Sequence, residues 1–164
     1  KTSGKNFIFP KYKMKKIRTL EELFERKREE FVFNAMTISL DEVIDYGKIS
    51  KDIYPHNVGP TEYYKAPVVQ GSFIQALFTD LHKQICPVEN ICEPIKMGVH
   101  QHILPRAVYV ERDFTPWVRL ESVDKRNDHF EAVWSYKLLS TTPEAKGKPL
   151  VHYSFTWWYL FQKT

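Results

Sequence analysis

A carboxylate and an imidazole stand four residues apart in a proline-rich stretch of the sequence. They are Asp52 and His56, and the surrounding residues 51–67 contain three prolines and one glycine, a composition typical of a loop. A carboxylate and an imidazole that share a water molecule can supply both the base and the acid of a proton-transfer reaction, provided that each pKa suits its task. In the alternative interpretation, Asp52 caps a turn and His56 lies on the surface.

Gly71 stands near the start of the longest helical pattern in the chain, residues 68–85. The first N–H groups of a helix lack intrahelical partners and lie at its positive end. Because glycine has no side chain, an oxygen that gains negative charge during a reaction could approach the Gly71 N–H closely and be stabilised there. Gln70 and Ser72 flank this position and could add polar contacts. A plain glycine at a helix start is the alternative.

A His-x-His pair and two cysteines are the remaining candidates for metal or redox chemistry. His100 and His102 fall in a predicted strand, 97–104, whose alternation would place both on one face. Paired histidines can bind zinc, but no third ligand is evident in the sequence, so we expect no metal. Cys86 and Cys92 have neither zinc-ligand nor redox spacing, and we expect both to be small buried apolar residues, with a disulfide left open.

Helices precede strands in the predicted order of elements. Two capping boxes, Thr19 with Glu22 and Ser39 with Glu42, mark the starts of two helices. Periodicity and local composition together predict helix 19–30, strand 31–38, helix 40–50, loop 51–67, helix 68–85, and strands 97–104, 107–114, 117–125, 129–140 and 149–161. This order favours an α+β fold, in which one curved antiparallel sheet wraps against one long helix.

Aromatic residues dominate the last predicted strand. Alternation gathers four of them on one face, and this predicts a strand buried on both sides or placed at an interface: Tyr153, Phe155, Trp157 and Tyr159. In contrast, we expect three histidines on the surface of a helix or a strand, namely His82, His129 and His152.

The positive charge of the chain is concentrated at its start. Of 24 lysines and arginines, seven lie in residues 1–18 without any acid, which leaves 17 bases against 20 acids in the rest of the 164 residues. We expect a basic arm with a short helix over residues 1–30 and one domain over 31–164. The arm is either solvated or in contact with a partner.

Nucleic acid is not an expected ligand, because the basic residues lie in the arm and the aromatic residues in apolar strands. No apolar run approaches the length of a transmembrane helix, and no signal-peptide pattern is present. Together with only two cysteines, these features predict a cytoplasmic protein without a membrane span.

Several of these motifs, taken in order, resemble the MaoC-like hydratases of the hot-dog fold, a group that includes (R)-specific enoyl-CoA hydratases. The resemblance covers roughly residues 31–162. It rests on TISLDEVIDYGKISKDIYP with Ser50, Asp52 and Pro55, on YYKAPVVQGSFIQALFTDL with Tyr64, Pro67 and Gly71, and on RDFTPWVRLESV with Phe114 and Pro116.

The resemblance implies a single hot-dog domain that hydrates enoyl thioesters or dehydrates 3-hydroxyacyl thioesters without a cofactor. It implies catalytic roles for Asp52, His56 and Gly71, and substrate contacts for Asn57, Tyr64, Gln70 and Ser72. The catalytic histidine of the group usually stands five residues after the aspartate. Here Asn57 holds that position and His56 precedes it.

Two other functions remain open. A non-catalytic subunit, which shapes an acyl tunnel for an active partner, is favoured by Asn57, Gln70 and Ala76, where the group has two histidines and a serine. An acyl thioesterase would use another carboxylate, Asp80 or Glu62. The resemblance also implies a homodimer or a heterodimer, and a substrate carried by coenzyme A or by an acyl carrier protein.

Overall fold

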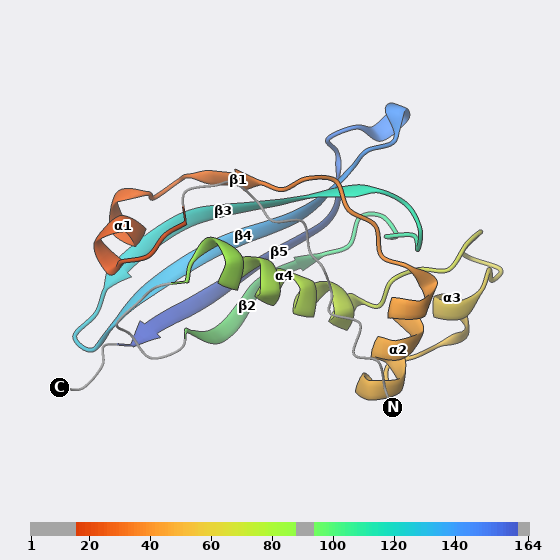
Figure 1. Cartoon of the computed structure of the whole chain (residues 1–164), viewed down its shortest axis with the longest axis horizontal. Helices are drawn as coiled ribbons and strands as arrows, with labels where there is room; N and C mark the ends of the chain where they lie inside the picture. The colour runs from red at the N-terminus through yellow and green to blue at the C-terminus, as the bar shows by residue number, and fades with distance from the viewer. Residues whose placement is uncertain (1–15, 88–93, 161–164) are drawn as a thin grey trace.

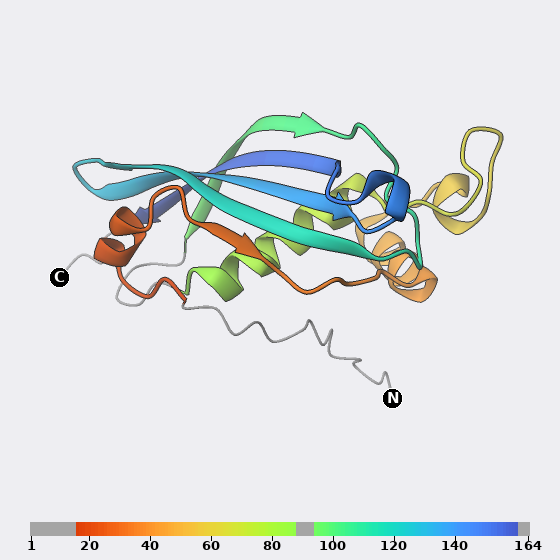
Figure 2. The same cartoon turned by 90° about the horizontal axis from the view of Figure 1, so that it is seen from above.

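The computed structural model describes residues 16–87 and 94–160 (Figure 1). Its centre is one antiparallel sheet of five strands in the order β1-β3-β4-β5-β2. The strands are β1 (Glu30–Val32), β2 (Ile95–Ile103), β3 (Phe114–Lys125), β4 (His129–Ser140) and β5 (Pro149–Leu160). The sheet curves around one long helix, α4 (Gly71–Ile85), as Figure 2 shows from above. The predicted α+β arrangement of one curved sheet and one long helix is confirmed.

The apolar face of α4 forms the centre of the core. The Phe78 ring of α4 lies 5.2 Å from Tyr136 on β4 and 5.5 Å from Tyr153 on β5, measured between ring centroids. The predicted alternation of the last strand is confirmed, because one face of β5 is at most 2% exposed at Tyr153, Phe155, Trp157 and Tyr159. Burial of such large rings supplies much of the hydrophobic stabilisation of a core.

Within residues 16–70, three shorter helices precede α4, namely α1 (Leu20–Glu25), α2 (Leu40–Ser50) and α3 (Pro55–Val58). The capping box of α2 is confirmed in full, since Ser39 Oγ accepts from the Glu42 N–H at 3.3 Å and the Glu42 carboxylate accepts from the Ser39 N–H at 2.7 Å. In α1, Thr19 Oγ1 accepts from the Glu22 N–H at 3.1 Å. This helix ends before residue 30, because the chain turns at Arg28, whose φ is 71°.

The strand predicted over 31–38 is reduced to β1 and one isolated bridge between Met36 and Phe114. By contrast, β4 occupies residues 129–140 as predicted. A one-turn 3-10 helix (Pro143–Ala145) lies in the connection between β4 and β5. The predicted loop 51–67 contains the single turn of α3.

The segment predicted as a strand over 107–114 crosses the end of the sheet instead, and only its last residue begins β3. It must cross because it leads from β2, at one edge, to β3, next to the strand at the other edge. Its backbone therefore pairs with the chain that precedes α4: the Val69 N–H donates to the Val108 carbonyl at 2.8 Å, and the Val110 N–H to the Pro67 carbonyl at 2.9 Å.

His82 is buried in the core, so the prediction of a surface position is wrong. Its side chain is 0% exposed, and its Nδ1 and Nε2 atoms lie 2.8 Å and 2.9 Å from the hydroxyls of Tyr136 and Tyr159. The imidazole also stacks on Trp157, with ring centroids 4.0 Å apart. A polar ring on the apolar face of α4 is accommodated because two strands supply hydrogen-bond partners for both of its nitrogens.

His129 is also more buried than predicted. It is 9% exposed, lies 4.4 Å from the Trp158 ring and has Asp128 as a partner at 2.7 Å. The adjacent tryptophan covers the imidazole, which explains why the surface prediction is wrong. Cys86 is buried as predicted, and Cys92 lies outside the described residues.

The described residues before β1 pack on the same core. Ile17 and Leu23 are 0% exposed, and the Ile17 N–H donates to the Ile85 carbonyl at 2.8 Å. Residues 1–15 lie outside the described ranges, so the basic arm and its boundary at residue 30 stay predictions. Within the described ranges, no helix is both long and apolar enough to cross a membrane.

Candidate active site

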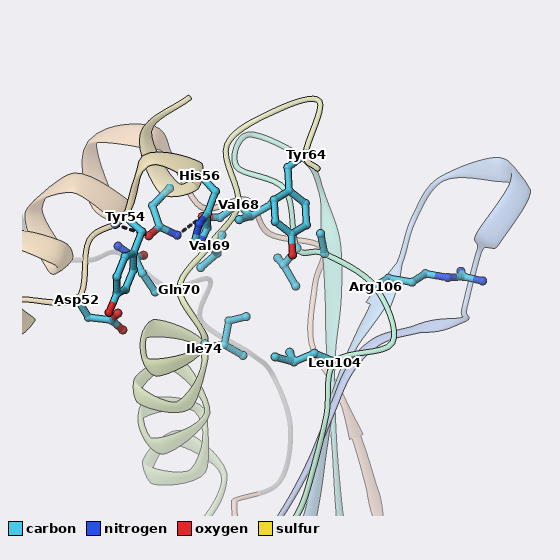
Figure 3. Close-up of a pocket in the computed structure, with 14 residues that line it drawn as sticks. Asp52, Tyr54, His56, Tyr64, Val68, Val69, Gln70, Ile74, Leu104 and Arg106 are labelled. Carbon is cyan, nitrogen blue, oxygen red and sulfur yellow. Dashed lines mark hydrogen bonds between the residues drawn. The ribbon is translucent and has the colours of Figure 1, made fainter. Parts of the chain in front are cut away.

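A pocket of about 280 Å³ opens at the N-terminal end of α4, where three stretches of chain meet (Figure 3). They are the α2–α3 connection with α3, the segment that leads into α4, and residues 104–108 after β2. Six of the seven predicted site residues line it, namely Asp52, His56, Asn57, Tyr64, Gln70 and Gly71. The fold thus gathers residues that are up to 19 positions apart in the sequence around one cavity.

Asp52 is held against the first turn of α4. Helix α2 ends at Ser50, and the left-handed backbone of its C-cap, Lys51 (φ 60°, ψ 20°), reverses the chain just before Asp52. The Asp52 N–H donates to Ser50 Oγ at 3.2 Å, and its Oδ2 accepts a hydrogen bond from Ser72 Oγ. Ser72, the seventh predicted residue, thus fixes the carboxylate at the positive end of a helix, a position that suits an anionic group.

His56 lies between two tyrosine rings in the lining of the pocket. Its ring is parallel to Tyr54, with centroids 5.7 Å apart and an interplanar angle of 4°, and lies 5.8 Å from Tyr64 at 48°. Among the described residues, no hydrogen bond or ion pair joins His56 to Asp52. The rings orient the imidazole, and its sharing of a water molecule with Asp52 stays a prediction.

Asn57 ties α3 to the segment that leads into α4. It is 1% exposed, its Oδ1 accepts from the Tyr54 N–H at 2.9 Å, and its Nδ2 donates to the Val68 carbonyl at 2.9 Å. The Val68 N–H in turn donates to the His56 carbonyl at 2.9 Å. Asn57 thereby satisfies backbone groups of two segments that line the pocket, and its contact with a substrate stays a prediction.

Gln70 anchors the start of α4 to α2. Its side chain is 4% exposed and Nε2 donates to the Val43 carbonyl at 3.0 Å, while Oε1 is buried without a hydrogen-bond partner among the described residues. The close approach depends on Gly47 in α2, because a Cβ there would lie 3.1 Å from Gln70 Nε2 and 2.8 Å from the Cβ of Ile53. Packing of α2 on α4 therefore sets the position of the residue before Gly71.

Gly71 begins α4, and the preceding residue provides no side-chain cap for the helix. Its carbonyl accepts a hydrogen bond from the Tyr153 hydroxyl at 3.4 Å, and the same hydroxyl lies 2.7 Å from His102 Nε2. Burial raises the pKa of Tyr153, against a smaller opposing effect of a hydrogen bond with Gln75. The phenol therefore stays protonated and braces the first peptide of α4, a role that alternation in β5 did not reveal.

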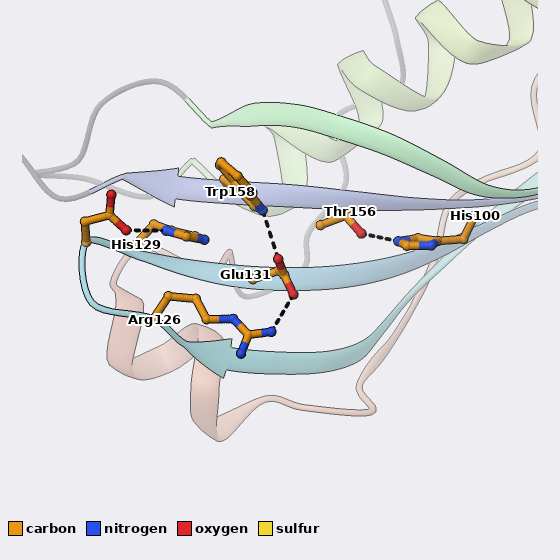
Figure 4. Close-up of polar contacts among 7 residues, drawn as sticks. His100, Arg126, His129, Glu131, Thr156 and Trp158 are labelled. Carbon is orange, nitrogen blue, oxygen red and sulfur yellow. Dashed lines mark hydrogen bonds and ion pairs between the residues drawn. The ribbon is translucent and has the colours of Figure 1, made fainter.

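The sequence predicted that the two histidines of the His-x-His pair share a face of β2. This prediction is wrong. A register shift between Val99 and Gln101 inserts His100 as an extra residue, so His102 pairs with Tyr153 while His100 contacts Thr156 (Figure 4). These two positions of β5 are three residues apart and so point to opposite faces of the sheet. In the part of the chain that the structure describes, no three His, Cys, Asp or Glu side chains form a metal-binding group.

The carboxylates considered for a thioesterase lie away from the pocket lining. Asp80 lies in α4 and accepts a hydrogen bond from Gln84 Nε2 at 2.8 Å, and Glu62 is exposed. In contrast, sequence reasoning did not assign eight of the lining residues to the site. Among these eight, Ile74 and Leu104 face each other across the pocket, and Arg106 extends away from Asp52 (Figure 3). Leu104 and Arg106 come from the segment after β2, which no local motif connects to α4.

Comparisons with known proteins give matches in structure alone. No protein-family model matches the chain, and no curated protein is significantly similar to it in sequence. Among solved structures, the chain is similar to the (R)-hydratase from A. caviae involved in PHA biosynthesis, with a TM-score of 0.64 and 19% identity over 80% of this chain and 94% of that chain.

Two further structures extend the comparison. A MaoC-like dehydratase from Rhodospirillum rubrum has a TM-score of 0.66 and 12% identity over 89% of this chain and 98% of that one. The HadBC (3R-hydroxyacyl-ACP dehydratase) complex from Mycobacterium tuberculosis has a TM-score of 0.62 and 13% identity over 81% of this chain and 96% of that one. The structural neighbours are thus MaoC-like dehydratases and (R)-hydratases, and the chain shares their hot-dog fold.

Proposed function

We propose that this protein is a hydro-lyase of acyl thioesters, which hydrates enoyl thioesters or dehydrates 3-hydroxyacyl thioesters. The observation that carries the proposal is the meeting of Asp52, His56 and Gly71 at one pocket. The proposal is supported by the structural similarity to an (R)-hydratase and to a 3R-hydroxyacyl-ACP dehydratase complex.

In the proposed reaction, Gly71 stabilises the charge that develops on the substrate. The thioester carbonyl oxygen accepts a hydrogen bond from the Gly71 N–H at the positive end of α4. When water adds to the β-carbon, negative charge moves onto this oxygen, and a fixed N–H donor then stabilises the transition state more than the ground state. The Tyr153 hydroxyl, bonded to the Gly71 carbonyl, keeps this donor in place.

Asp52 and His56 move the two protons. Asp52 takes a proton from water as the water oxygen bonds to the β-carbon, and His56 gives a proton to the α-carbon, so that one water is added across the double bond. The proton on Asp52 then returns to His56 through solvent, which restores both groups for the next turnover. The reverse sequence gives dehydration. Ser72 orients the carboxylate by donating to its Oδ2. Asn57, Tyr64 and Gln70 complete the substrate-facing wall, a set of contacts that belongs to the same proposal.

A second candidate function, a non-catalytic subunit of a heteromeric dehydratase, is favoured by the surroundings of His56. The imidazole lies between Tyr54 and Tyr64 rather than on Asp52, and both polar atoms of Asn57 serve the backbone. A chain with this arrangement would shape an acyl tunnel, and an active partner would supply the histidine.

Both candidate functions include a dimer, and the edge strand β2 is the surface proposed for it. Among the described residues, this strand pairs only with β5, and no strand lies along its other edge. Its exposed apolar side chains are Ile95, Met97, Val99 and Ile103, between 44% and 49% exposed. A long open edge with apolar side chains favours pairing with another chain. The partner is a second copy or a related hot-dog subunit.

The first test measures turnover of a panel of enoyl thioesters of different chain lengths. Loss of the conjugated double bond and release of free thiol are followed in the same samples. We expect hydration, and a fall of about a hundredfold or more in the Asp52→Asn variant, the usual scale for loss of an acid–base group. The matched control is Asp45→Asn, because Asp45 lies on the exposed side of α2 and pairs with Lys48.

Other outcomes decide between the functions. Thiol release without hydration would refute the proposal and identify a thioesterase. A folded protein that is inactive alone but restores activity to a related subunit would establish the non-catalytic function. Hydration that survives the Asp52→Asn change would refute the assigned site.

A further inference from the structure

A second pocket lies next to the candidate active site and shares a wall with it. It has a volume of about 360 Å³ and is formed by the β2–β3 connection together with the end of β4 and the β4–β5 connection. Residues 106–108 line both pockets. A ligand that passes the Arg106 backbone would therefore occupy both.

The lining of the second pocket combines an apolar floor with a cationic rim. Val108 and Phe114 are 3% and 1% exposed and form part of the floor with Leu150. The rim carries two exposed arginines, Arg106 and Arg112. Apolar floors with a few charged groups at the rim are typical of sites for small organic ligands.

The polar groups of the rim favour an anion. The Arg112 guanidinium lies over the Tyr109 ring, 4.9 Å from its centroid. Its N–H groups lie in the plane of the guanidinium and take no part in that contact. The Arg106 side chain extends from the active-site pocket toward the β4–β5 connection (Figure 3). Among the described residues of the lining, Asp113 is the one acid, and its carboxylate accepts a hydrogen bond from Thr37 at 3.1 Å. Two guanidinium groups against one carboxylate leave a net positive rim, suited to phosphate.

We propose that this second pocket binds the phosphate-bearing nucleotide end of coenzyme A, while the thioester end of the same molecule lies in the candidate active site. The inference rests on the proposed function for the position of the thioester. In this arrangement the heterocyclic base packs on the apolar floor, and Arg106 and Arg112 bind the phosphates. The pantetheine chain, which links nucleotide and thioester, passes along residues 106–108.

A pocket of this size fits a small molecule better than it fits a carrier protein. A protein partner needs an extended complementary surface rather than one concave site. Residues 19–164 contain 17 bases and 20 acids, so the body of the chain has no general excess of positive charge for an acidic protein. The positive charge at this place is local to the two arginines. These observations favour coenzyme A over a carrier protein.

The test is direct binding of free coenzyme A, which requires no turnover. Titration calorimetry is carried out on the parent protein and on Arg106→Ala, Arg112→Ala and Arg126→Ala. We expect the first two changes each to weaken binding tenfold to a hundredfold, as expected for the loss of a charge-assisted hydrogen bond. The control Arg126 lies at the other end of β4, where it pairs with Glu131 at 2.9 Å (Figure 4). Its removal should leave binding unchanged.

A second measurement separates this inference from the proposed function. Turnover of one acyl group is compared on coenzyme A and on N-acetylcysteamine, which lacks the nucleotide. We expect the Arg112→Ala change to reduce the preference for the coenzyme A thioester at least tenfold, through KM rather than kcat.

The outcomes are decisive in each case. Equal binding of coenzyme A by the parent and both arginine variants would overturn the nucleotide site, as would turnover of carrier-protein thioesters by a parent that does not bind coenzyme A. Arginine-dependent binding of coenzyme A without turnover of any thioester would support the nucleotide site and refute the proposed function.

Discussion

Acid is expected to destabilise this protein through one buried histidine, His82. Both of its ring nitrogens contact tyrosine hydroxyls, at 2.8 Å for Tyr136 and 2.9 Å for Tyr159. The Tyr136 hydroxyl accepts from Trp157 Nε1 at 2.9 Å, and in the tautomer of His82 that also satisfies the phenol hydrogen, Tyr136 donates this hydrogen to His82 Nδ1. The Nε2–H of the neutral ring then donates to Tyr159. A second proton on the ring would leave the Tyr136 hydrogen without this acceptor.

The magnitude follows from the pKa of His82. Burial, with a smaller contribution from the charge of Lys83, lowers this pKa from 6.5 to about 3. In the unfolded chain the imidazole takes up a proton below its ordinary pKa, whereas in the folded protein it stays neutral down to the lowered value. The stability from the neutral ring is therefore present above the unfolded pKa and is lost as the pH falls from there toward the folded one. Each pH unit in this window costs about 1.4 kcal/mol, so the step from pH 7 to pH 5 removes about 2 kcal/mol of unfolding free energy.

The assay is urea denaturation at pH 7 and pH 5 of the parent and of the His82→Gln variant. Glutamine keeps a polar side chain in the core but does not titrate. At pH 7 the free energy of unfolding of the variant should be about 1–3 kcal/mol lower than that of the parent, the range for a disrupted buried hydrogen-bond network. Its stability should then fall between the two pH values by about 2 kcal/mol less than that of the parent.

A second histidine variant serves as the comparison. Partial burial, followed by the charge of Lys137, also lowers the pKa of His152, against an opposing effect of Glu121. His152→Gln therefore measures a contribution of the same sign from a half-buried site, which should be smaller than that of His82. If His82→Gln loses as much stability between pH 7 and pH 5 as the parent does, the reasoning about the buried imidazole is wrong.

Two further predictions concern the frame around the candidate site. Gly47→Ala should destabilise the protein by about 1–3 kcal/mol in urea denaturation, because the new Cβ would lie 2.8 Å from the Ile53 Cβ. The control is Gly98→Ala, whose Cβ would meet no atom within 4 Å. A gain in stability for Gly47→Ala, as helix propensity alone would give, would contradict this packing argument. Asn57→Ala should lower the free energy of unfolding by about 2 kcal/mol or more, because two backbone groups lose their hydrogen-bond partners. The control is Asn127→Ala in the exposed β3–β4 turn, which should change the free energy of unfolding little. Equal stabilities of these two variants would show that Asn57 does not have the structural role assigned to it.

The parts of the fold that could be predicted from the sequence are those determined by local signals. The capping box of Ser39 and Glu42 marks the start of α2, because both hydrogen bonds join residues three apart. The β-rich composition of residues 129–140, between two turn-like connections, predicts β4 with its bounds. Such signals depend on neighbours in the chain and not on the rest of the molecule.

The errors occur where a distant segment decides the outcome. Residues 107–113 have the composition of a strand, but the sheet order requires them to cross between its edges. The bulge in β2 that separates His100 from His102 depends on the register with β5. The sequence predicted a surface position for His82 because histidine is polar. The hydroxyls that make its burial possible come from β4 and β5, which are distant in the sequence.

The candidate site also combines a local signal with the effect of a distant segment, here within the single turn of α3. Successive residues in a helix point about 100° apart, so His56 and Asn57 of α3 cannot face the same way. Asn57 faces the interior and holds the backbone of Tyr54 and Val68 together. The imidazole one position earlier is therefore directed to the rings of Tyr54 and Tyr64. A histidine in place of Asn57 would have to give up the bonds that hold α3 against the segment leading to Gly71. The acid–base chemistry proposed for this chain therefore depends on His56, in the position that the buried Asn57 imposes on it.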